Sequence, residues 1–303
     1  MFGNIIIDTV LTIILALGVI LLIWTFVEPH ILTVRREVLP PVDGNGGNGG
    51  NGGNGGNECA AGTGVPRGSA RIFFFSDLHA EFCFISPARL IAVIEKEHKA
   101  RPLDAVVFGG DIINNPLKHE KGKDYLSKAA EALKRLGIPF YGVTGNHDVM
   151  IPASELEGYD IRWLHGDCTI LESKDGNIPF ALAGVRDSGR ECRVWYDVPA
   201  LPEGQAVSRK ILIAHNPDVV LHMKDTDTCD YIISGHIHRG QIRTPFGIEF
   251  TVLRKDDLPR QKVITGTHII NGKCLHISDG IGCVRLPMRF LCLPQVSVLD
   301  IPL

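Results

Sequence analysis

Apolar runs that stop at polar or charged clusters define the pattern of this chain. Such runs occupy residues 72–76, 105–110, 138–143, 211–214 and 231–235. Each is short and rich in β-branched or aromatic residues, or is bounded by Gly, Ser or Thr, which is typical of buried β-strands. Amphipathic helical periodicity over residues 87–100 and 123–136 separates the first three runs. Alternating strands and helices predict an α/β domain with a parallel or mixed sheet.

Beyond Trp163 the helical periodicity fades and short strand-like segments dominate. We predict strands at residues 169–171, 180–185 and 211–215, and later at residues 250–253, 268–270, 275–277 and 296–299. The pattern alone does not define the order of these strands in a sheet.

The amino-terminal segment is the most hydrophobic part of the chain. Residues 5–27 are almost continuously apolar, which is long enough for a helix that crosses ~30 Å of hydrocarbon. We predict a transmembrane anchor. A cleaved signal peptide is the alternative, but no Lys or Arg precedes the run and no clear cleavage site follows it. Arg35 and Arg36 follow the span whereas Asp8 lies near its start, so the positive-inside rule places the carboxyl-terminal domain in the cytoplasm.

Residues 28–69 are predicted to form a linker between this anchor and a domain at residues 70–303. Within the linker, residues 44–57 repeat Asn-Gly-Gly, a composition that cannot bury a core and favours no single backbone conformation. A flexible tether of this kind, with a root-mean-square span of ~20 Å, would keep the domain near the bilayer. A tolerated low-complexity expansion is an equally good interpretation of the repeat.

Composition limits the classes of protein that fit this domain. The chain has 303 residues, 45% hydrophobic and 21% charged, and a formal net charge of −3. These values exclude a disordered chain and provide no bulk positive charge for nucleic-acid binding. The eight cysteines show no Cys-x-x-Cys pair and no regular spacing, which favours buried reduced thiols over a disulfide framework. Nothing in the sequence indicates an oligomeric state.

The polar clusters that end the apolar runs are the candidates for chemistry. In chain order they are Asp77-Leu78-His79, Asp111, Gly145-Asn146-His147-Asp148, His215 and His236-Ile237-His238. Asn and Asp beside Gly are common turn formers, so one such cluster is weak support for a site. The whole set is hard to explain structurally, because buried ionisable groups need partners. If the strand ends meet at one edge, the clusters would converge on a site for more than one metal ion.

With these clusters in view, the chain resembles the calcineurin-like metallophosphoesterases. The family motifs Asp-x-His, Gly-Asp, Gly-Asn-His-Asp, a lone His and Gly-His-x-His all occur here in the family's order. The resemblance extends over about residues 71–303, and residues 214–218, 234–241 and 280–294 look like the bacterial YkuE/YaeI-type branch. It implies an α/β fold of two packed mixed β-sheets flanked by helices, with metals at the strand ends.

The resemblance also implies a centre of two divalent metal ions and its ligands. One ion would be bound by Asp77, His79 and His238, the other by Asn146, His215 and His236, with Asp111 bridging the two. A set of oxygen and nitrogen ligands without thiolates suits Mn²⁺, with Fe or Zn²⁺ as alternatives. Two such cations lower the pKa of a water and clamp a phosphate for attack on phosphorus. His147 carries over as the catalytic group that stabilises the transition state or protonates the leaving oxygen, with Asp148 orienting its ring.

Residues around the motifs give expectations about the substrate. Arg239, directly after the last predicted ligand, could grip a phosphate, although a solvated loop Arg explains it as well. Residues 284–294 mix apolar side chains with Arg285 and Arg289, and residues 82–85 read Phe-Cys-Phe-Ile. Apolar and basic surface beside a membrane tether suits an acyl-bearing phosphorylated substrate, whereas core packing explains residues 82–85 at least as well. Asn114 stands where many relatives have an acid, which affects the surroundings of the metals and not their ligands.

We therefore expect a membrane-tethered, metal-dependent phosphohydrolase that acts on a phosphorylated small molecule or lipid. The leading substrate is UDP-2,3-diacylglucosamine, because the YkuE/YaeI-type branch is similar to a chlamydial enzyme that splits this compound in lipid A synthesis. A general phosphodiesterase or phosphomonoesterase of the cell envelope is the alternative. A non-catalytic scaffold of the same fold is the rival from another class, but such a scaffold would be expected to lose ligands or the catalytic His, and here each is present.

Overall fold

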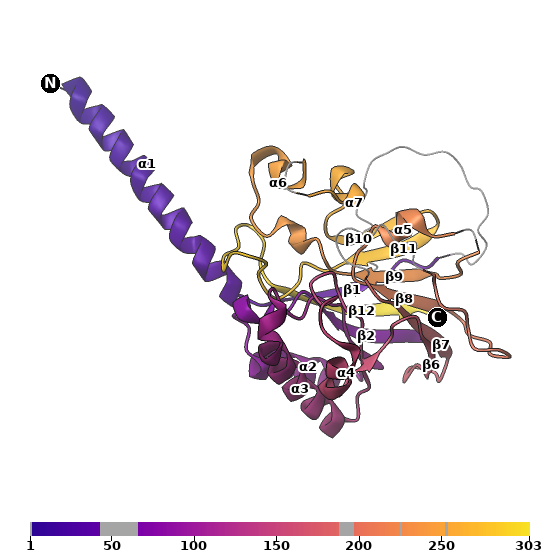
Figure 1. The fold of residues 1–303 in the computed structure, drawn as a ribbon. Helices are drawn as coiled ribbons and strands as arrows, with labels where there is room; N and C mark the ends of the chain where they lie inside the picture. The colour runs from indigo at the N-terminus through magenta and orange to yellow at the C-terminus, as the bar shows by residue number, and fades with distance from the viewer. Residues whose placement is uncertain (1, 43–65, 188–196, 225, 252–253) are drawn as a thin grey trace.

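The computed structural model describes residues 2–42, 66–187, 197–224, 226–251 and 254–303. Two six-stranded β-sheets lie at its centre and helices flank them, while one long helix extends away from the domain (Figure 1). The predicted fold class, α/β with two mixed sheets, is confirmed. The Asn-Gly-Gly repeat at residues 44–57 lies outside the described residues.

The first sheet has the strand order β1-β12-β2-β3-β4-β5. Strand β12 is parallel to β1 and antiparallel to β2, and β2 to β5 are parallel to one another. The bounds are β1 Thr33–Val38, β2 Ser69–Phe75, β3 Ala105–Phe108, β4 Phe140–Gly142, β5 Arg162–Trp163 and β12 Gln295–Pro302. Three of the five apolar runs therefore end at the same edge of one sheet.

The second sheet has the order β10-β11-β9-β8-β7-β6. Strands β11, β9, β8 and β7 are parallel, and the two outer strands are antiparallel to their neighbours. The bounds are β6 Cys168–Glu172, β7 Pro179–Val185, β8 Lys210–Ala214, β9 Tyr231–Ser234, β10 Gly266–Ile270 and β11 Lys273–Ile277. The other two apolar runs are β8 and β9, which are neighbours in this sheet.

The strands of both sheets are apolar because their two faces are buried in different hydrophobic clusters. In β2, Phe73 and Phe75 belong to a cluster shared with the helices, whereas Ile72 and Phe74 belong to a cluster shared with the second sheet. This alternation is the two-residue period of a strand that is buried on both faces. A third cluster covers the far face of the second sheet. Burial of both faces holds the strand ends, and the loops that follow them, in fixed positions.

The two long helices of the domain pack on the first sheet. Helix α2, Pro87–Ala100, has the predicted bounds and begins at Ser86, whose Oγ accepts a hydrogen bond from the Arg89 N–H at 3.3 Å. Helix α3, His119–Leu136, begins four residues earlier than predicted and ends at Gly137, which has a φ of 65°.

The short helices are α4 Ala153–Leu156, α5 Val219–His222, α6 Ile248–Thr251 and α7 Asp257–Arg260. The 3₁₀ turns are η1 Glu28–His30, η2 Ala80–Phe82, η3 Pro116–Lys118, η4 Glu157–Tyr159, η5 His238–Gly240 and η6 Pro245–Gly247.

Two sequence predictions are corrected by the structure. Residues 250 and 251, predicted as the start of a strand, belong to helix α6, because Phe250 points into the core from a helical turn rather than from a sheet. Residues 33–38, predicted as part of the linker, form strand β1 and pair with β12 in register from Thr33–Gln295 to Val38–Asp300. A six-residue strand at a sheet edge, with mostly half-buried residues, lacks the apolar run that marked the central strands.

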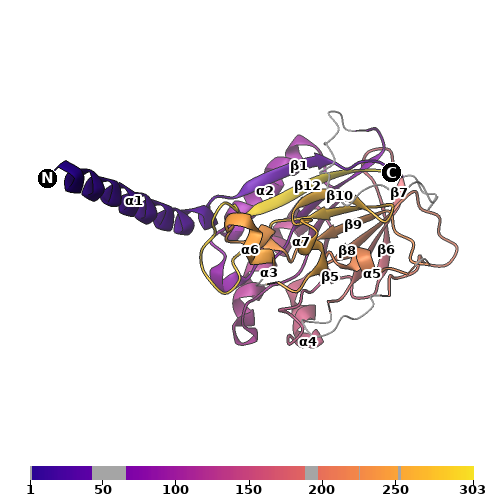
Figure 2. The ribbon, with the colours of Figure 1, turned by 90° about the horizontal axis from the view of Figure 1, so that it is seen from above.

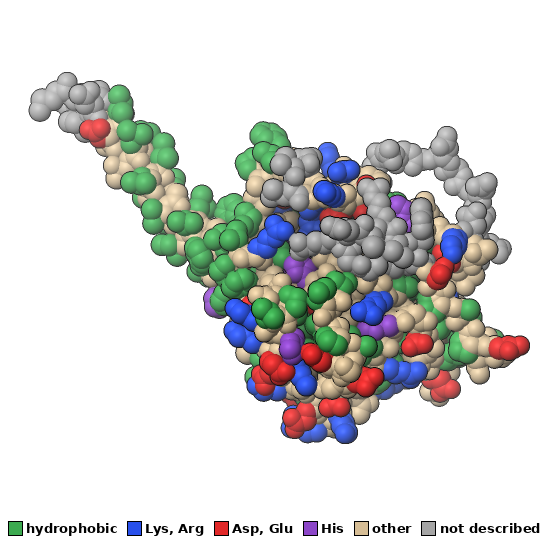
Figure 3. Space-filling model, viewed as in Figure 1, with side chains coloured by type: hydrophobic (Ala, Val, Ile, Leu, Met, Phe, Trp, Pro, Cys, Tyr) green, Lys and Arg blue, Asp and Glu red, His purple; other side chains and the backbone are tan. Residues whose placement is uncertain are grey.

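The amino-terminal helix α1, Phe2–Val27, leaves the domain as a separate rod (Figures 1 and 2). It is long and apolar enough to cross a membrane, and its most apolar window has no residue buried against the rest of the chain. Hydrophobic side chains, drawn in green, cover most of its visible face in Figure 3. An exposed apolar surface of this size is unfavourable in water.

Candidate metal centre

The polar clusters sit on tight turns at the ends of the strands. Five residues of the predicted ligand set have a left-handed backbone, with φ between 39° and 69°: Asp77, His79, Asp111, His236 and His238. This conformation is uncommon for residues with a Cβ and costs free energy, so it persists where the surrounding structure enforces it and is concentrated at functional sites. The turns that carry these five residues are therefore held in place by the structure around them.

Two glycines allow the turns to approach one another. An added Cβ at Gly110, whose φ is 94°, would lie 2.6 Å from the Gly145 nitrogen and 2.9 Å from His215 Nδ1. An added Cβ at Gly145 would lie 2.2 Å from Asp111 Oδ1. The Gly-Asp and Gly-Asn-His-Asp motifs therefore need glycine because the loops touch at these points.

The first candidate metal group consists of Asp77, His79 and His238, whose ligand atoms lie within 4.8 Å of one another. His238 Nε2 is 3.2 Å from Asp77 Oδ1 and 3.1 Å from His79 Nε2. All three side chains are buried. Two imidazoles and a carboxylate pointing at one place form a set that suits a divalent cation.

The second group consists of Asp111, His215 and His236, again with ligand atoms within 4.8 Å of one another. Asp111 Oδ2 lies 3.2 Å from His215 Nε2 and 3.6 Å from His79 Nε2. Because this one oxygen faces both groups, Asp111 is placed between the two candidate metal positions.

Asn146 provides a test of whether these residues fit a metal ion. Its side-chain oxygen Oδ1 is buried and has no hydrogen-bond partner within the described part of the chain. A buried amide oxygen without a partner costs about 1–3 kcal/mol, and a cation at this position would satisfy it. Its neighbour His147 donates its backbone N–H to Asp111 Oδ1 at 2.8 Å, which holds the Asn146 loop against the second group. The donor set therefore fits two divalent ions, with the metal identity left open.

Hydrogen bonds at the outer ring nitrogens select the tautomers that metal ligation requires. His215 Nδ1 lies 2.8 Å from the carbonyl oxygen of Gly109, and His79 Nδ1 lies 3.3 Å from that of Ile113. A carbonyl can only accept, so Nδ1 carries the proton in both rings and Nε2 is free to bind a cation.

His236 is oriented by a residue that the sequence analysis missed. Its Nδ1 faces the second group, 3.2 Å from His215 Nε2, and its Nε2 lies 3.2 Å from Asp256 Oδ1. Arg254 donates to Asp256 Oδ2 at 3.0 Å and to the His236 carbonyl at 2.8 Å. Burial acts to raise the pKa of Asp256, but the hydrogen bond to His236 and the charge of Arg254 hold this pKa below its usual range. The only sequence signal was a charged stretch after α6, and such stretches usually lie in solvent.

Burial and mutual charge set the protonation of the ligands. Burial lowers the pKa of His79 to about 3 and also lowers the pKa of His238. Burial acts in the same direction on His215, but the charge of Asp111 overrides it and raises the pKa of His215 to about 10. Since a cation binds neutral imidazole, metal binding at the second group must release this proton.

His147 lies at the metal centre, while Asp148 makes contacts that sequence reasoning did not foresee. The His147 ring packs edge-on to the His79 ring, with centroids 4.9 Å apart. The Asp148 carboxylate accepts backbone hydrogen bonds from Asp111 and Ile112 at 2.8 Å and from Gly145 at 2.9 Å. Burial and the nearby Asp111 charge raise the pKa of Asp148 to about 8. Asp148 therefore ties two ligand loops together, and its predicted role in orienting the His147 ring stays a prediction.

The three arginines predicted to bind substrate occupy different environments. Arg239 is half-exposed, with Nη1 3.7 Å from Asp279 Oδ2, and Arg285 is exposed on the loop before β12. Arg289 is fully buried and donates to the carbonyl oxygens of Asp279, Gly280, Gly282 and Cys292. This placement does not support contact of Arg289 with a substrate, because its guanidinium is used to fix the backbone of residues 279–292.

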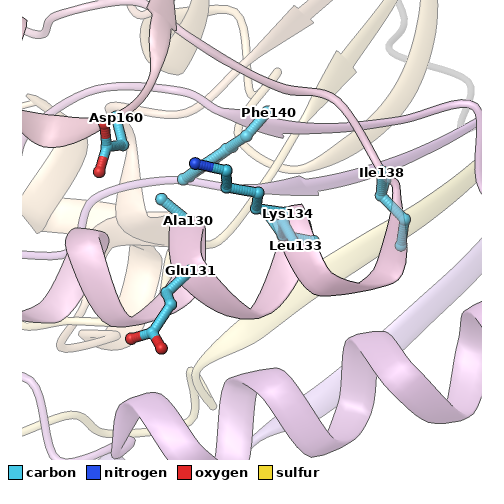
Figure 4. Close-up of a pocket in the computed structure, with 7 residues that line it drawn as sticks. All are labelled: Ala130, Glu131, Leu133, Lys134, Ile138, Phe140 and Asp160. Atoms are coloured by element: carbon cyan, nitrogen blue, oxygen red, sulfur yellow. The ribbon is translucent and has the colours of Figure 1, made fainter.

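A cavity of about 420 Å³ lies apart from this centre, between α3 and the start of β4. Figure 4 shows its lining, which includes Lys134, Phe140 and Asp160. Because the ligand loops follow the carboxyl ends of the strands, a cavity at the amino end of β4 is not part of the metal centre.

Fold and site together define a hydrolase with two candidate metal positions. Residues 70–240 match the family model for calcineurin-like phosphoesterases, and the chain belongs to this family. It is therefore a metallophosphoesterase that acts on phosphoesters with metal ions as cofactors.

Its relatives are distant. The uncharacterized metallophosphoesterase YkoQ of Bacillus subtilis is 27% identical over 77% of this chain and 84% of the relative. Phosphodiesterase YaeI of Escherichia coli is 25% identical over 76% of this chain and 82% of the relative. The uncharacterized metallophosphoesterase YkuE of Bacillus subtilis is 28% identical over 77% of this chain and 80% of the relative. The resemblance to this group of proteins is confirmed at the level of distant homology.

Proposed function

We propose that this metallophosphoesterase is anchored to a membrane by α1 and hydrolyses a lipid-linked pyrophosphate, with UDP-2,3-diacylglucosamine as the leading candidate. The observation that carries the proposal is the combination of two groups of side chains that could each hold a metal ion with an exposed apolar helix on the same chain. The products would be UMP and the acylated sugar 1-phosphate.

The residues of this chain have separate roles in the proposed reaction. Asp77, His79 and His238 would hold one divalent ion, and Asn146, His215 and His236 the other, with Asp111 shared between them. When bound, the two ions supply Lewis acidity, which neutralises phosphate charge and makes water a better nucleophile at neutral pH. His147, whose ring contacts that of His79, would stabilise the transition state or donate a proton to the leaving phosphate oxygen. Mn²⁺ is the leading metal because the donors are oxygen and nitrogen only.

The substrate-binding part of the proposal now rests on two arginines. Arg239, which directly follows His238 and is half-exposed, and Arg285, which is exposed, would bind the phosphate groups of the substrate. Arg289 contributes indirectly, since it shapes the backbone next to them.

A cytoplasmic position of the domain is proposed from Arg35 and Arg36, which follow the span. Both arginines also have partners inside the domain: Arg35 pairs with Glu37, and Arg36 Nη2 lies 2.5 Å from Glu97 Oε1. These ion pairs stabilise the fold and are therefore a second explanation for the two arginines, independent of membrane orientation. The orientation is tested directly below.

The experiment that tests the substrate offers the purified protein the acylated and deacylated UDP-sugars side by side in detergent with Mn²⁺. UMP release is followed for both compounds. We expect faster release from the acylated sugar. Equal rates on both, or release from neither together with rapid turnover of simple diesters, would remove the lipid-linked substrate. A general phosphodiesterase, the class that the name of YaeI states for that protein, would then be the better assignment.

A further inference from the structure

The base of helix α1 is fastened to the loop that precedes β12. Glu28, which is 2% exposed, accepts hydrogen bonds from the backbone N–H groups of Leu291 at 3.0 Å and Cys292 at 3.1 Å. The N–H of Arg289 donates to the carbonyl oxygen of Thr25, in the last turn of the helix, at 2.9 Å. A buried carboxylate with two backbone donors holds the helix end and the loop as one unit.

The same loop is also part of the metal centre. The Cys292 thiol donates to the carbonyl oxygen of His238 at 2.9 Å, and the Gly282 N–H donates to that of Asp77 at 2.8 Å. Helix α1 therefore leaves the domain at the edge where the ligand loops lie. Figures 1 and 2 both show its base beside the yellow segment that leads into β12.

Large apolar side chains are exposed around this edge. We call Phe84, Phe246, Ile248, Leu286 and Leu291 the apolar collar; their exposed fractions range from 39% to 101%. Phe84, Leu286 and Leu291 lie on loops, Phe246 lies in the 3₁₀ turn η6, and Ile248 begins the short helix α6. Solvent contact by such residues costs roughly 25 cal/mol per Å² of apolar area, and grouped exposure of this kind marks an interaction surface.

The collar is physically continuous with the base of α1. The Phe84 ring contacts the His30 ring, with centroids 4.6 Å apart. The η6–α6 segment, which carries Phe246 and Ile248, is joined to the same loop, since the Arg243 N–H donates to the Phe290 carbonyl at 3.0 Å. Gln241 Nε2 donates to the carbonyls of Val284 and Leu286, each at 3.1 Å. In Figure 1, α6 rises on the side of the domain from which α1 leaves, and Figure 3 shows hydrophobic side chains at this projection.

We propose that the face carrying the metal centre rests on the lipid bilayer, with the apolar collar in the interfacial region around the base of α1. The centre then opens toward lipid headgroups, and a phosphorylated lipid reaches it without leaving the membrane. Arg285 is exposed beside Leu286, as expected for a basic residue next to anionic headgroups. This inference rests on the proposed membrane anchoring and names the surface through which the substrate arrives.

The bilayer is favoured over a protein partner because of α1. A helix that spans a membrane forces the residues bonded to its base to the level of the headgroups, and Leu291 is one of these residues. The other collar residues lie around that point, so lipid would be the apolar surface in contact with them.

Site-directed photo-crosslinking of the full chain tests this arrangement. We would replace Ile248, and separately Leu291, with p-benzoylphenylalanine and reconstitute the protein in vesicles of phosphatidylethanolamine and phosphatidylglycerol. Irradiation joins the probe to a nearby C–H bond, and mass spectrometry identifies the adduct. We expect lipid adducts at both positions.

The matched control is Ile269, which is 46% exposed compared with 49% for Ile248. Strand β10 is antiparallel to β11, and β11 is parallel to β9, so Ile269 near the end of β10 lies toward the edge opposite the metal centre. We expect at least a tenfold lower lipid yield there. Equal yields at the collar and at Ile269, or adducts of the collar with protein in place of lipid, would overturn the inference.

The outcome is separable from that of the proposed function. Crosslinking requires no turnover, so lipid adducts without UMP release would remove the substrate and leave the membrane-facing surface. UMP release without collar-specific adducts would support the substrate and remove the membrane-facing surface. Equal metal content in all variants shows that the fold is retained.

Discussion

At the scale of single residues, His147 and Asp111 separate catalysis from metal binding. His147 packs on a ligand ring without a place in either ligand group, whereas Asp111 Oδ2 faces both groups. We expect His147→Ala to retain both metals and to lose about 10²–10⁴-fold in turnover, the usual size of a general-acid contribution. Asp111→Ala should lose metal. Metal content and aryl-phosphate hydrolysis of the two purified variants decide this, and equal metal loss in both would show that the roles are misassigned.

Asp256 offers a second test at this scale. Because its carboxylate fixes the ring of His236, Asp256→Asn is expected to weaken metal binding or activity by about 10–100-fold. The adjacent Asp257 is the control, since its carboxylate lies near His222 and Arg260 and faces no metal ligand in the described structure. Metal titration of both Asn variants measures the effect. Similar affinities for the two variants would remove the positioning role of Asp256.

These residues also show which parts of the candidate site could be predicted from the sequence. The clusters that contain the predicted ligands could be found because they follow apolar runs, and the family resemblance then assigned the ligands. The structure brings six of the seven together in two groups at the strand ends. Asp256 could not be found, because it acts across a loop, 20 residues from His236, and no periodicity links the two. The burial of Arg289 was equally hidden, since only the folded backbone supplies the carbonyls that hold its guanidinium.

At the scale of elements, strand β1 was missed because it carries charges and lies at a sheet edge. Its Glu37 illustrates how charge can be accommodated there. The carboxylate accepts from Thr267 Oγ1 at 2.6 Å, lies 3.2 Å from His276 Nδ1 and pairs with Arg35. These contacts join the first sheet to β10 and β11 of the second. Sequence patterns report burial along one segment, and they do not reveal a partner strand more than 200 residues away.

The same contacts predict a pH-dependent contribution to stability. Burial acts to raise the pKa of Glu37, but the hydrogen bond to His276 and the other contacts lower it to about 2. A carboxyl with a lowered folded-state pKa stabilises the protein above its unfolded pKa of ~4.3, and this stabilisation is lost as pH falls toward 2.

We therefore expect Glu37→Gln to reduce the free energy of unfolding by about 1–3 kcal/mol at pH 7. The loss should be smaller at pH 3.5, where part of the native stabilisation is already gone. Urea unfolding at the two pH values measures it, with the exposed Glu172→Gln as the control. A loss that is the same at both pH values would contradict the assigned role.

At the scale of the whole molecule, the position of α1 predicts how the protein partitions. The full chain should sediment with membranes and resist carbonate extraction, because α1 exposes an apolar surface along a length that can span a bilayer. A chain that begins at residue 31 loses α1 and keeps β1, so carbonate should release it from membranes even if the apolar collar still touches the lipid surface. Release of the full chain by carbonate would contradict a membrane-spanning helix.

The orientation has its own test. A cytoplasmic domain predicts that added protease digests it in inverted vesicles and spares it in intact spheroplasts. Digestion in spheroplasts would reverse the orientation and favour an exported phosphodiesterase.

The position of β12 between β1 and β2 has a consequence for biosynthesis. Residues 295–302 leave the ribosome more than 200 residues after β1, yet they separate two strands that are both made earlier. Strand β1 emerges directly after α1, when the helix would already be entering the membrane, and it has no partner until β12 arrives. At roughly 5–20 residues per second, this delay lasts on the order of 10–60 s. During that time β1 has an unpaired edge, which lies at the membrane surface if α1 is the proposed anchor. A chaperone would have most effect on the yield of folded protein in this period.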